Sequence, residues 1–140
     1  MEQKQLGKIK NFLEKPRIAV VATIKKDGTP QLSPNWYIYK DEFIYISTTK
    51  SRAKYWNLNR DRRVTISIYS EPLAGDYVVL EGECDILPKN EIFPITEQIV
   101  KLYVSENLVK ERVEQIKKED RVLLRIKPKR FLSRFWGTVI

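Results

Sequence analysis

The chain has 140 residues, of which 42% are hydrophobic and 31% are charged, and this is the composition of an ordinary globular protein with one domain. It contains no histidine and a single cysteine, Cys84. This excludes an intrachain disulfide, a zinc site of the usual Cys/His kind and every nucleophile paired with histidine. The net charge of +8 favours partners that carry phosphate, from a nucleotide cofactor to nucleic acid, and does not choose between them.

The first predicted elements are a helix and a strand. An apolar stripe of helical period predicts a helix over Lys4–Lys15, which ends at Pro16. The run Arg17–Ile24 is β-branched and almost entirely apolar, so it predicts a strand that is buried on both faces or lines a barrel. The turn Lys25–Gly28 contains Asp-Gly, the strongest short indication of a hairpin. A helix followed by a hairpin is therefore expected at the start of the chain.

The second strand of this hairpin contains a proline. It is expected over Pro30–Tyr39, and Pro34 within it cannot donate a hydrogen bond to a neighbouring strand. The strand is therefore expected to be bulged, unpaired or at a sheet edge near Pro34. Phe43–Ser47 is the third predicted strand, and a helix is expected to follow from Ala53 to Leu58 or Arg60.

The second half of the chain is expected to hold strands on either side of a helical segment. Arg63–Tyr69 alternates between apolar and polar residues, which predicts a half-buried strand. Asp76–Leu87 predicts a long strand with a bulge or a barrel corner at Gly82. Two helices are expected over Asn90–Ser105 and Asn107–Lys118, and two closing strands over Arg121–Ile126 and Arg130–Thr138.

Long strands joined by tight turns favour a mainly β fold, an antiparallel barrel with peripheral helices, because closure removes exposed sheet edges. An αβ sandwich is the alternative. One domain is expected over residues 1–140, since no linker or internal repeat interrupts the pattern. Met1–Gln5 lacks the apolar run of a signal peptide, and no stretch approaches the roughly 20 apolar residues of a membrane span. With a single cysteine, these features predict a cytoplasmic protein.

The most informative run is Ser47–Lys54, Ser-Thr-Thr-Lys-Ser-Arg-Ala-Lys, where a predicted strand passes into a predicted helix. The first turn of a helix has unpaired N–H groups and a partial positive charge, and Lys50, Arg52 and Lys54 add three cations there. The run therefore predicts an anion site, with phosphate as the usual ligand. The alternative is a solvated basic turn that is capped by Ser51.

Two neighbouring groups extend this site. Asn57 lies three residues after Lys54 and shares a helical face with it, close to Arg60. The cations Arg60, Arg62 and Arg63 pair instead with Asp61 and other surface acids in the alternative interpretation. In the second strand, Trp36 offers a stacking surface beside the backbone groups that Pro34 leaves free, and the alternative is a tryptophan of the core.

Other candidate residues have structural explanations. Aromatic residues alternate with cations at Tyr55, Trp56, Tyr69, Tyr77, Phe131, Phe135 and Trp136. They are interpreted as core or subunit-interface residues, because no nucleic-acid-binding motif accompanies them. Cys84 is flanked by acids, which raise a thiol pKa, and is interpreted as structural. Glu81, Glu83 and Asp85 share one strand face and are expected to face solvent or to pair with the basic residues; a two-carboxylate hydrolase has no other support.

Together these runs resemble the pyridoxamine-5′-phosphate-oxidase-like split-barrel flavoproteins, and most closely the branch that uses the deazaflavin coenzyme F-420. The residues that carry the resemblance are Ala22–Ile24, Asp27–Pro30, Ser33–Tyr37, Ser47–Thr49, Lys54–Val64 and Val79–Gly82. It covers about half of the chain, Arg17–Asp85, and the C-terminal third is only loosely alike. Asp61-Arg62-Arg63 stands where the family often has Asp-Pro-Arg, and the C-terminal Arg-x-His element is absent, so oxidation of pyridoxamine phosphate is not expected.

The resemblance implies a split barrel of six or seven strands that forms a homodimer, with two cofactor sites at the interface and FMN or coenzyme F-420 as the cofactor. By position, Ser47, Thr48 and Thr49 line the phosphate end, and Ser51, Arg52 and Lys54 hold the phosphate. Pro34, Asn35 and Trp36 lie beside the ring, and Ser33 and Asn57 are assigned to the same site. The implied activity is hydride transfer between this cofactor and a small conjugated substrate, with no metal. A flavin-binding or carrier protein without catalysis and a basic nucleic-acid-binding module are the alternatives.

Overall fold

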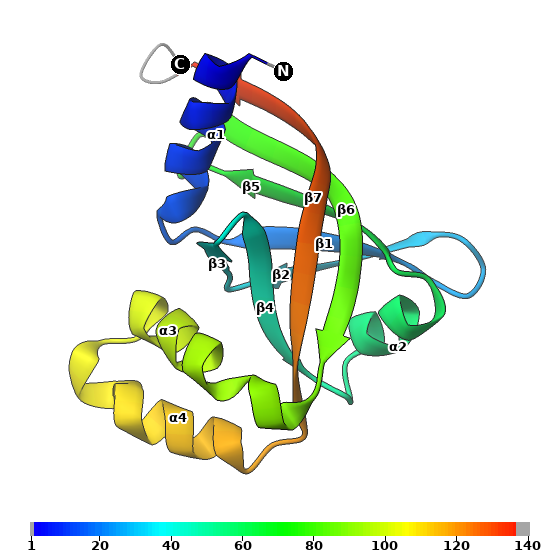
Figure 1. The fold of residues 1–140 in the computed structure, drawn as a ribbon, viewed down its shortest axis with the longest axis vertical. Coiled ribbons are helices and arrows are strands. Elements are labelled where there is room, and N and C mark those ends of the chain that lie inside the picture. The colour runs from blue at the N-terminus through cyan, green and yellow to red at the C-terminus, as the bar shows by residue number, and fades with distance from the viewer. Residues whose placement is uncertain (1, 137–140) are drawn as a thin grey trace.

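The computed structural model describes residues 2–136. In this part of the chain, seven antiparallel strands form one curled sheet in the order β2-β1-β5-β6-β7-β4-β3, and α-helices lie around it (Figure 1). The strands are β1 Ala19–Ile24, β2 Pro30–Asn35, β3 Ile38–Lys40, β4 Phe43–Thr49, β5 Arg63–Tyr69, β6 Asp76–Leu87 and β7 Arg121–Phe135. The helices are α1 Gln3–Glu14, α2 Ala53–Arg60, α3 Phe93–Tyr103 and α4 Val109–Lys117. The mainly β split barrel with peripheral helices is therefore confirmed.

The sheet is curled because its two edge strands are neighbours in the sequence. β2 ends at Asn35 on one edge and β3 begins at Ile38 on the other. Three Cα–Cα steps, which span about 11 Å when fully extended, must therefore connect the two edges. The seam of the barrel lies at this crossing, Trp36 and Tyr37. Pro34 lies on the edge strand β2, as the sequence predicts for a residue without a backbone donor.

The core fills the inside of the barrel. Along β5, Val64, Ile66 and Ile68 are buried and the residues between them are more exposed, which is the predicted alternation. α1 closes one end of the barrel with its buried face, which includes Ile9 and Leu13 (Figure 1). Each such side chain contributes about 1.5–3 kcal/mol by leaving water.

The predicted irregularity at Gly82 is confirmed. The register between β6 and β7 shifts between Glu81 and Gly82, which marks a bulge. A Cβ atom at Gly82 would lie against the Lys127 carbonyl group, 3.0 Å from its carbon. Only glycine therefore allows the two strands to approach this closely.

Two predicted strand boundaries are wrong. The expected strand Pro30–Tyr39 is divided into β2 and β3, because the chain crosses the seam within it. The two expected closing strands are one strand, β7, which continues through Pro128 because the bulge opposite Gly82 accommodates the proline. The predicted end of the last strand, Thr138, lies outside the described residues.

The remaining helices pack outside the barrel. α3 covers the outer face of β4 and β7 through a small cluster that includes Tyr45, Ile99 and Leu123. α4 lies beside α3 and packs on it through Val100, Val113 and Ile116 (Figure 1). The predicted helix Asn90–Ser105 is shorter in the structure, because a 3₁₀ turn, Lys89–Glu91, precedes α3. Over residues 2–136, no helix has the length and apolar character that crossing a bilayer requires.

Candidate functional site

A cavity of about 600 Å³ lies beside the seam of the barrel, where β2, β4, β7 and the start of α2 meet. Nine of the eleven residues predicted for the cofactor site line it: Ser33, Pro34, Asn35, Trp36, Ser47, Thr48, Thr49, Arg52 and Lys54. Ile18, Arg112, Glu119 and Arg121 complete its wall. A larger groove of about 820 Å³ between α3 and α4 is lined by valines and by lysines mixed with glutamates, and it has no comparable set of cations and hydroxyl groups.

The turn between β4 and α2 places hydroxyl groups and cations at one end of this cavity. The Arg52 N–H donates to the Thr49 carbonyl at 3.1 Å, and the Lys50 N–H donates to the Asp120 carbonyl at 3.1 Å. Arg52 occupies the N-cap position of α2, with no side chain capping the helix. The Ser51 hydroxyl lies 2.8 Å from Thr49 Oγ1 and does not cap α2, so the predicted cap is wrong, while the choice between an anion site and a solvated basic turn stays open. Ser51 borders a shallow hollow next to the cavity.

Lys54 is the buried cation of the site. Only 9% of this residue is exposed, and no acceptor among residues 2–136 lies within hydrogen-bonding or ion-pairing distance of its ammonium group. Burial lowers the pKa of Lys54, and the positive charges of Arg52 and Arg121 lower it further. A buried charge without a partner is unfavourable, and an anion bound in the cavity would relieve this cost.

Two arginines of the cavity share one carboxylate. Arg121 donates to Glu119 from Nε at 2.9 Å and from Nη2 at 2.6 Å, and it also donates to Ser47 Oγ at 3.4 Å. Arg112 lies 3.5 Å from the other oxygen of Glu119. Sequence analysis missed all three residues. Arg121 comes opposite Thr49 only through the β4–β7 pairing, and no local motif indicates that pairing.

The other end of the cavity lies at the seam. The Trp36 ring stacks on the Tyr103 ring with centroids 5.1 Å apart and planes within 2° of parallel. The Tyr103 hydroxyl donates to the Arg17 carbonyl at 2.6 Å and accepts the Tyr37 N–H at 3.3 Å. Trp36 is 38% exposed, so it is not a core residue. Tyr103 therefore supports one face of Trp36 and leaves the rest of the ring at the cavity.

Asn57 is the predicted site residue that the structure places elsewhere. Its amide nitrogen donates to Thr23 Oγ1 and Gln31 Oε1, each at 3.0 Å, and its oxygen accepts from Arg60 at 3.1 Å. It does not line the cavity. These contacts fix α2 to the β1–β2 hairpin, so the observed role of Asn57 is structural, and contact with a cofactor stays a prediction.

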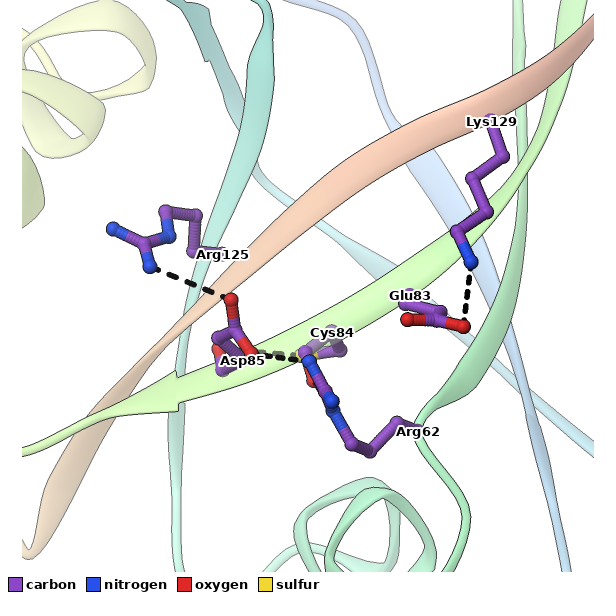
Figure 2. Close-up of polar contacts among 6 residues, drawn as sticks. All are labelled: Arg62, Glu83, Cys84, Asp85, Arg125 and Lys129. Carbon is purple, nitrogen blue, oxygen red and sulfur yellow. Dashed lines mark hydrogen bonds and ion pairs between the residues drawn. The ribbon is translucent and has the colours of Figure 1, made fainter.

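The acids of β6 lie on a different surface and pair with cations (Figure 2). Glu83 contacts Lys129 at 2.6 Å, and Asp85 contacts both Arg62 and Arg125, the second at 3.4 Å. The expectation that these acids pair with basic residues is confirmed, and none of them lines the cavity.

The interpretation that Arg60, Arg62 and Arg63 pair with acids holds for two of the three: Arg62 pairs with Asp85, and Arg63 pairs with Asp61 at 2.8 Å. Arg60 instead donates to the Ile24 carbonyl and to Asn57, at 2.9 and 3.1 Å. The hydrogen bonds from Arg63 lower the pKa of Asp61 to about 2. The structural interpretation of Cys84 is confirmed. Cys84 is buried, and burial, followed by the charge of Asp85, raises its pKa to about 12. This thiol is a structural residue.

The fold and the site define a class of proteins, antiparallel split barrels with a cationic cavity at the seam. The sequence profile described as pyridoxamine 5'-phosphate oxidase matches residues 6–135, and the chain therefore belongs to this family.

Solved structures show the same architecture. The chain is 25% identical to an F-420 reductase with a TM-score of 0.74, covering 88% of this chain and 94% of that one. It is 26% identical to a conserved hypothetical protein from Mycobacterium tuberculosis, with a TM-score of 0.80 and coverage of 96% and 85%. A haem storage protein from Vibrio cholerae is 14% identical, with a TM-score of 0.73 and coverage of 91% and 93%, and shares the fold.

Proposed function

We propose that the protein binds a flavin-type cofactor, FMN or the deazaflavin coenzyme F-420, and transfers a hydride between it and a small conjugated substrate. The observation that carries this proposal is Lys54, a buried cation without a partner in the described residues, in the wall of a cavity that Trp36 also lines. Membership of the pyridoxamine 5'-phosphate oxidase family and the likeness to an F-420 reductase support it.

The cations and hydroxyl groups suit the phosphate end of such a cofactor. Lys54 and Arg52 supply positive charge, and Ser47, Thr48 and Thr49 offer hydroxyl groups along one strand. A phosphate oxygen accepts several such donors at once, and charged hydrogen bonds are stronger than neutral ones. The donor set therefore fits a phosphate group.

The seam suits the ring system. Pro34 and Asn35 belong to an edge strand, and Trp36 presents a ring whose other side is supported by Tyr103. A cavity of about 600 Å³ is in the range of cofactor pockets, about 300–1,000 Å³. A planar ring that lies along Trp36 would leave one face open to a substrate.

The cofactor supplies the hydride chemistry, and the chain supplies position and charge. The cavity contains no histidine, and its one carboxylate, Glu119, is engaged by two arginines. The residues described here would therefore bind, orient and exclude water rather than transfer protons. Hydride transfer requires mainly that donor and acceptor atoms approach within roughly 3–3.5 Å.

A homodimer is part of this proposal. Large apolar side chains are exposed on two strands, with Leu32 of β2 64% exposed and Leu132 of β7 63% exposed. Such side chains are typical of surfaces that another chain covers. A second copy would then contribute to the open side of the cavity.

A flavin-binding or carrier protein without catalysis is the second candidate. It is favoured by the absence of an unengaged acid or base other than Lys54 among the described residues of the cavity wall. It predicts a bound cofactor and no turnover with any electron donor.

Spectra of the purified protein mixed with FMN and with coenzyme F-420 test the proposal, and two lysine variants locate the site. Lys54→Ala should weaken cofactor binding by about 1.5–3 kcal/mol, or roughly 10–150-fold, because it removes a charged donor. Lys50→Ala is the matched control, since Lys50 belongs to the same turn but pairs with Asp120 outside the cavity wall.

Lys50→Ala should keep the wild-type cofactor affinity within about threefold, because an exposed charge that is already paired contributes little to binding. Equal affinity of Lys54→Ala and wild type would exclude this cavity as the phosphate site. Retention of DNA with a steep salt dependence, and no change in either spectrum, would instead favour a nucleic-acid-binding module.

A further inference from the structure

Next to the main cavity lies a smaller one of about 40 Å³, here called the inner recess, which shares Trp36, Ser47, Arg112 and Arg121 with it. We propose that the inner recess binds a carboxylate-sized monoanionic group of the small substrate. This deepens the proposed function and rests on it, because the substrate is assigned to the ring end of the main cavity. It names the substrate class as small conjugated acids.

The first observation is an unpaired buried hydroxyl group in the wall of the inner recess. Thr96 of α3 is 1% exposed, and its Oγ1 has no hydrogen-bond partner in the described structure. Buried hydroxyl groups almost always have a partner. Since Thr96 lines the recess, an atom bound there can accept the hydrogen bond.

The second observation is the charge around the inner recess. Arg112 and Arg121 share the single carboxylate of Glu119, which leaves one positive charge on the three side chains. One further monoanion would neutralise the group. A carboxylate matches this charge, whereas a phosphate dianion exceeds it and fits the Arg52–Lys54 end better.

The third observation is size and polarity. The volume of about 40 Å³ exceeds the roughly 10–15 Å³ that one water molecule needs and is small enough to exclude a ring. Its wall combines the polar groups with Ile99 and Ile116. Cavities that remain dry are apolar throughout, so this one is expected to be filled.

The position of the recess assigns the group to a substrate rather than to the cofactor phosphate. Trp36, the aromatic residue of the ring end, lines the recess together with Ser47, the first residue of the hydroxyl run on β4. Arg52 and Lys54 line the main cavity but not the recess. The recess therefore lies between Trp36 and the start of the hydroxyl run, nearer the ring than Arg52 and Lys54 are, and a planar acid beside the ring could extend its carboxylate into it.

Benzoate, a planar conjugated monoanion, is a suitable probe, and benzamide is its neutral counterpart. Calorimetric titrations with wild type, Thr96→Val and Thr96→Ser, each with and without saturating FMN, test the proposal. Benzoate should bind wild type and Thr96→Ser similarly and Thr96→Val five- to twentyfold more weakly. Benzamide should bind all three weakly. A crystal soaked in benzoate should show a carboxylate oxygen within hydrogen-bonding distance of Thr96 Oγ1.

Thermal unfolding separates binding from a structural role. Thr96→Val keeps the volume and removes an unpaired hydroxyl group, so its melting temperature should equal or exceed that of wild type. A lower melting temperature with unchanged benzoate affinity would overturn the proposal, as would a recess that holds only water while benzoate binds elsewhere or not at all. Benzoate binding that depends on Thr96 in a protein that binds neither FMN nor coenzyme F-420 would retain the subsite and overturn the proposed function. Cofactor binding together with a benzoate affinity that Thr96→Val leaves unchanged would retain the proposed function and overturn the subsite.

Discussion

Two regions of the molecule hold cations in opposite ways. On the outer face of β6 and β7, Lys129, Arg62 and Arg125 each contact a carboxylate of β6 (Figure 2). In the cavity, Lys54 is more deeply buried and has no partner within the described residues. Burial makes an unpaired charge costly. A partner would therefore be expected for the lysine in the cavity more than for the cations on the β6–β7 face.

This difference distinguishes cations whose ion pairs stabilise the fold from a cation that is positioned to bind an anionic ligand. The paired cations belong to a half-exposed surface, where each ion pair contributes about 0.2–1 kcal/mol. Lys54 contributes an unfavourable charge that only an anion in the cavity would offset. Net charge alone, +8, could not have separated the two groups.

The largest expected effect within the cavity comes from the arginine that Glu119 neutralises. Arg121→Gln removes a cation and also frees most of the Glu119 carboxylate toward the site. We expect FMN or coenzyme F-420 affinity to fall by about 150-fold or more, beyond the range expected for Lys54→Ala, because the positive charge that Arg121 places near Lys54 is lost and the repulsion from Glu119 is gained. Fluorescence titration measures the change.

Glu119→Gln is the complementary variant. It keeps a similar shape and releases Arg121 and Arg112 from their shared acid. Cofactor affinity should rise severalfold at low ionic strength and less at high ionic strength. A decrease at both salt concentrations would mean that Glu119 positions the arginines rather than masking their charge, and the comparison with the β6 face would then fail.

The β6 face should respond in stability and not in binding. Asp85→Asn removes the carboxylate that Arg62 and Arg125 share, and it should lower the free energy of unfolding by about 1 kcal/mol, the sum of two half-exposed pairs. Urea unfolding measures this, and cofactor affinity should be unchanged.

Glu81→Gln is the matched control, because its partner Arg130 is 80% exposed and 3.6 Å away. We expect its effect on the free energy of unfolding to be within experimental error. An Asp85→Asn protein as stable as wild type would show that these pairs are incidental.

Much of this arrangement is visible in local sequence. The run Ser47–Lys54 predicts the turn, and Gly82 predicts the bulge, because a helix start and a bulge each depend on neighbouring residues. Arg112 and Arg121 could not be predicted, since they reach the cavity through the packing of α4 and the β4–β7 register. These are non-local contacts.

Non-local contacts also explain why the surroundings of Trp36 and Asn57 could not be predicted. Trp36 was predicted as a stacking residue, but its partner Tyr103 lies 67 positions later and approaches only because α3 covers the outside of the barrel. Asn57 shares a helical face with Lys54, but its amide group hydrogen-bonds to the β1–β2 hairpin instead of facing the cavity. A shared helical face thus predicts that two side chains lie on the same side of the helix, but it does not predict which residues of other elements each side chain contacts.

Lys54 should also give stability a characteristic dependence on pH. Its pKa in the folded protein is below the ordinary 10.5, so the unfolded chain binds more protons in the interval between the two values. Stability should therefore rise as pH increases through that interval toward 10.5. Lys54→Met should lack this rise and be at least as stable as wild type near neutral pH.

A bound anion should offset the cost of the buried Lys54 charge, and should therefore stabilise the protein near neutral pH as Lys54→Met does. Thermal unfolding in buffers from pH 8 to 10.5, with and without inorganic phosphate, tests both expectations. Phosphate should stabilise wild type and Asp85→Asn, and should stabilise Lys54→Met less. A Lys54→Met protein with the same pH profile as wild type would mean that this lysine is not the source of the dependence.

The smallest effect is expected at Asp61, the partly exposed partner of the exposed Arg63. Hydrogen bonds from Arg63 lower the pKa of Asp61 to about 2, below the ordinary 3.8. A lowered carboxyl pKa adds stability above 3.8 that disappears as the pH falls toward 2, because the proton then binds the folded state less readily than the unfolded one. Asp61→Asn should remove this contribution and shift the acid unfolding midpoint, measured by circular dichroism, slightly upward, with no change at neutral pH in cofactor affinity. An acid unfolding midpoint equal to that of wild type would contradict the argument, since the hydrogen bonds from Arg63 are the stated cause of the lowered pKa of Asp61.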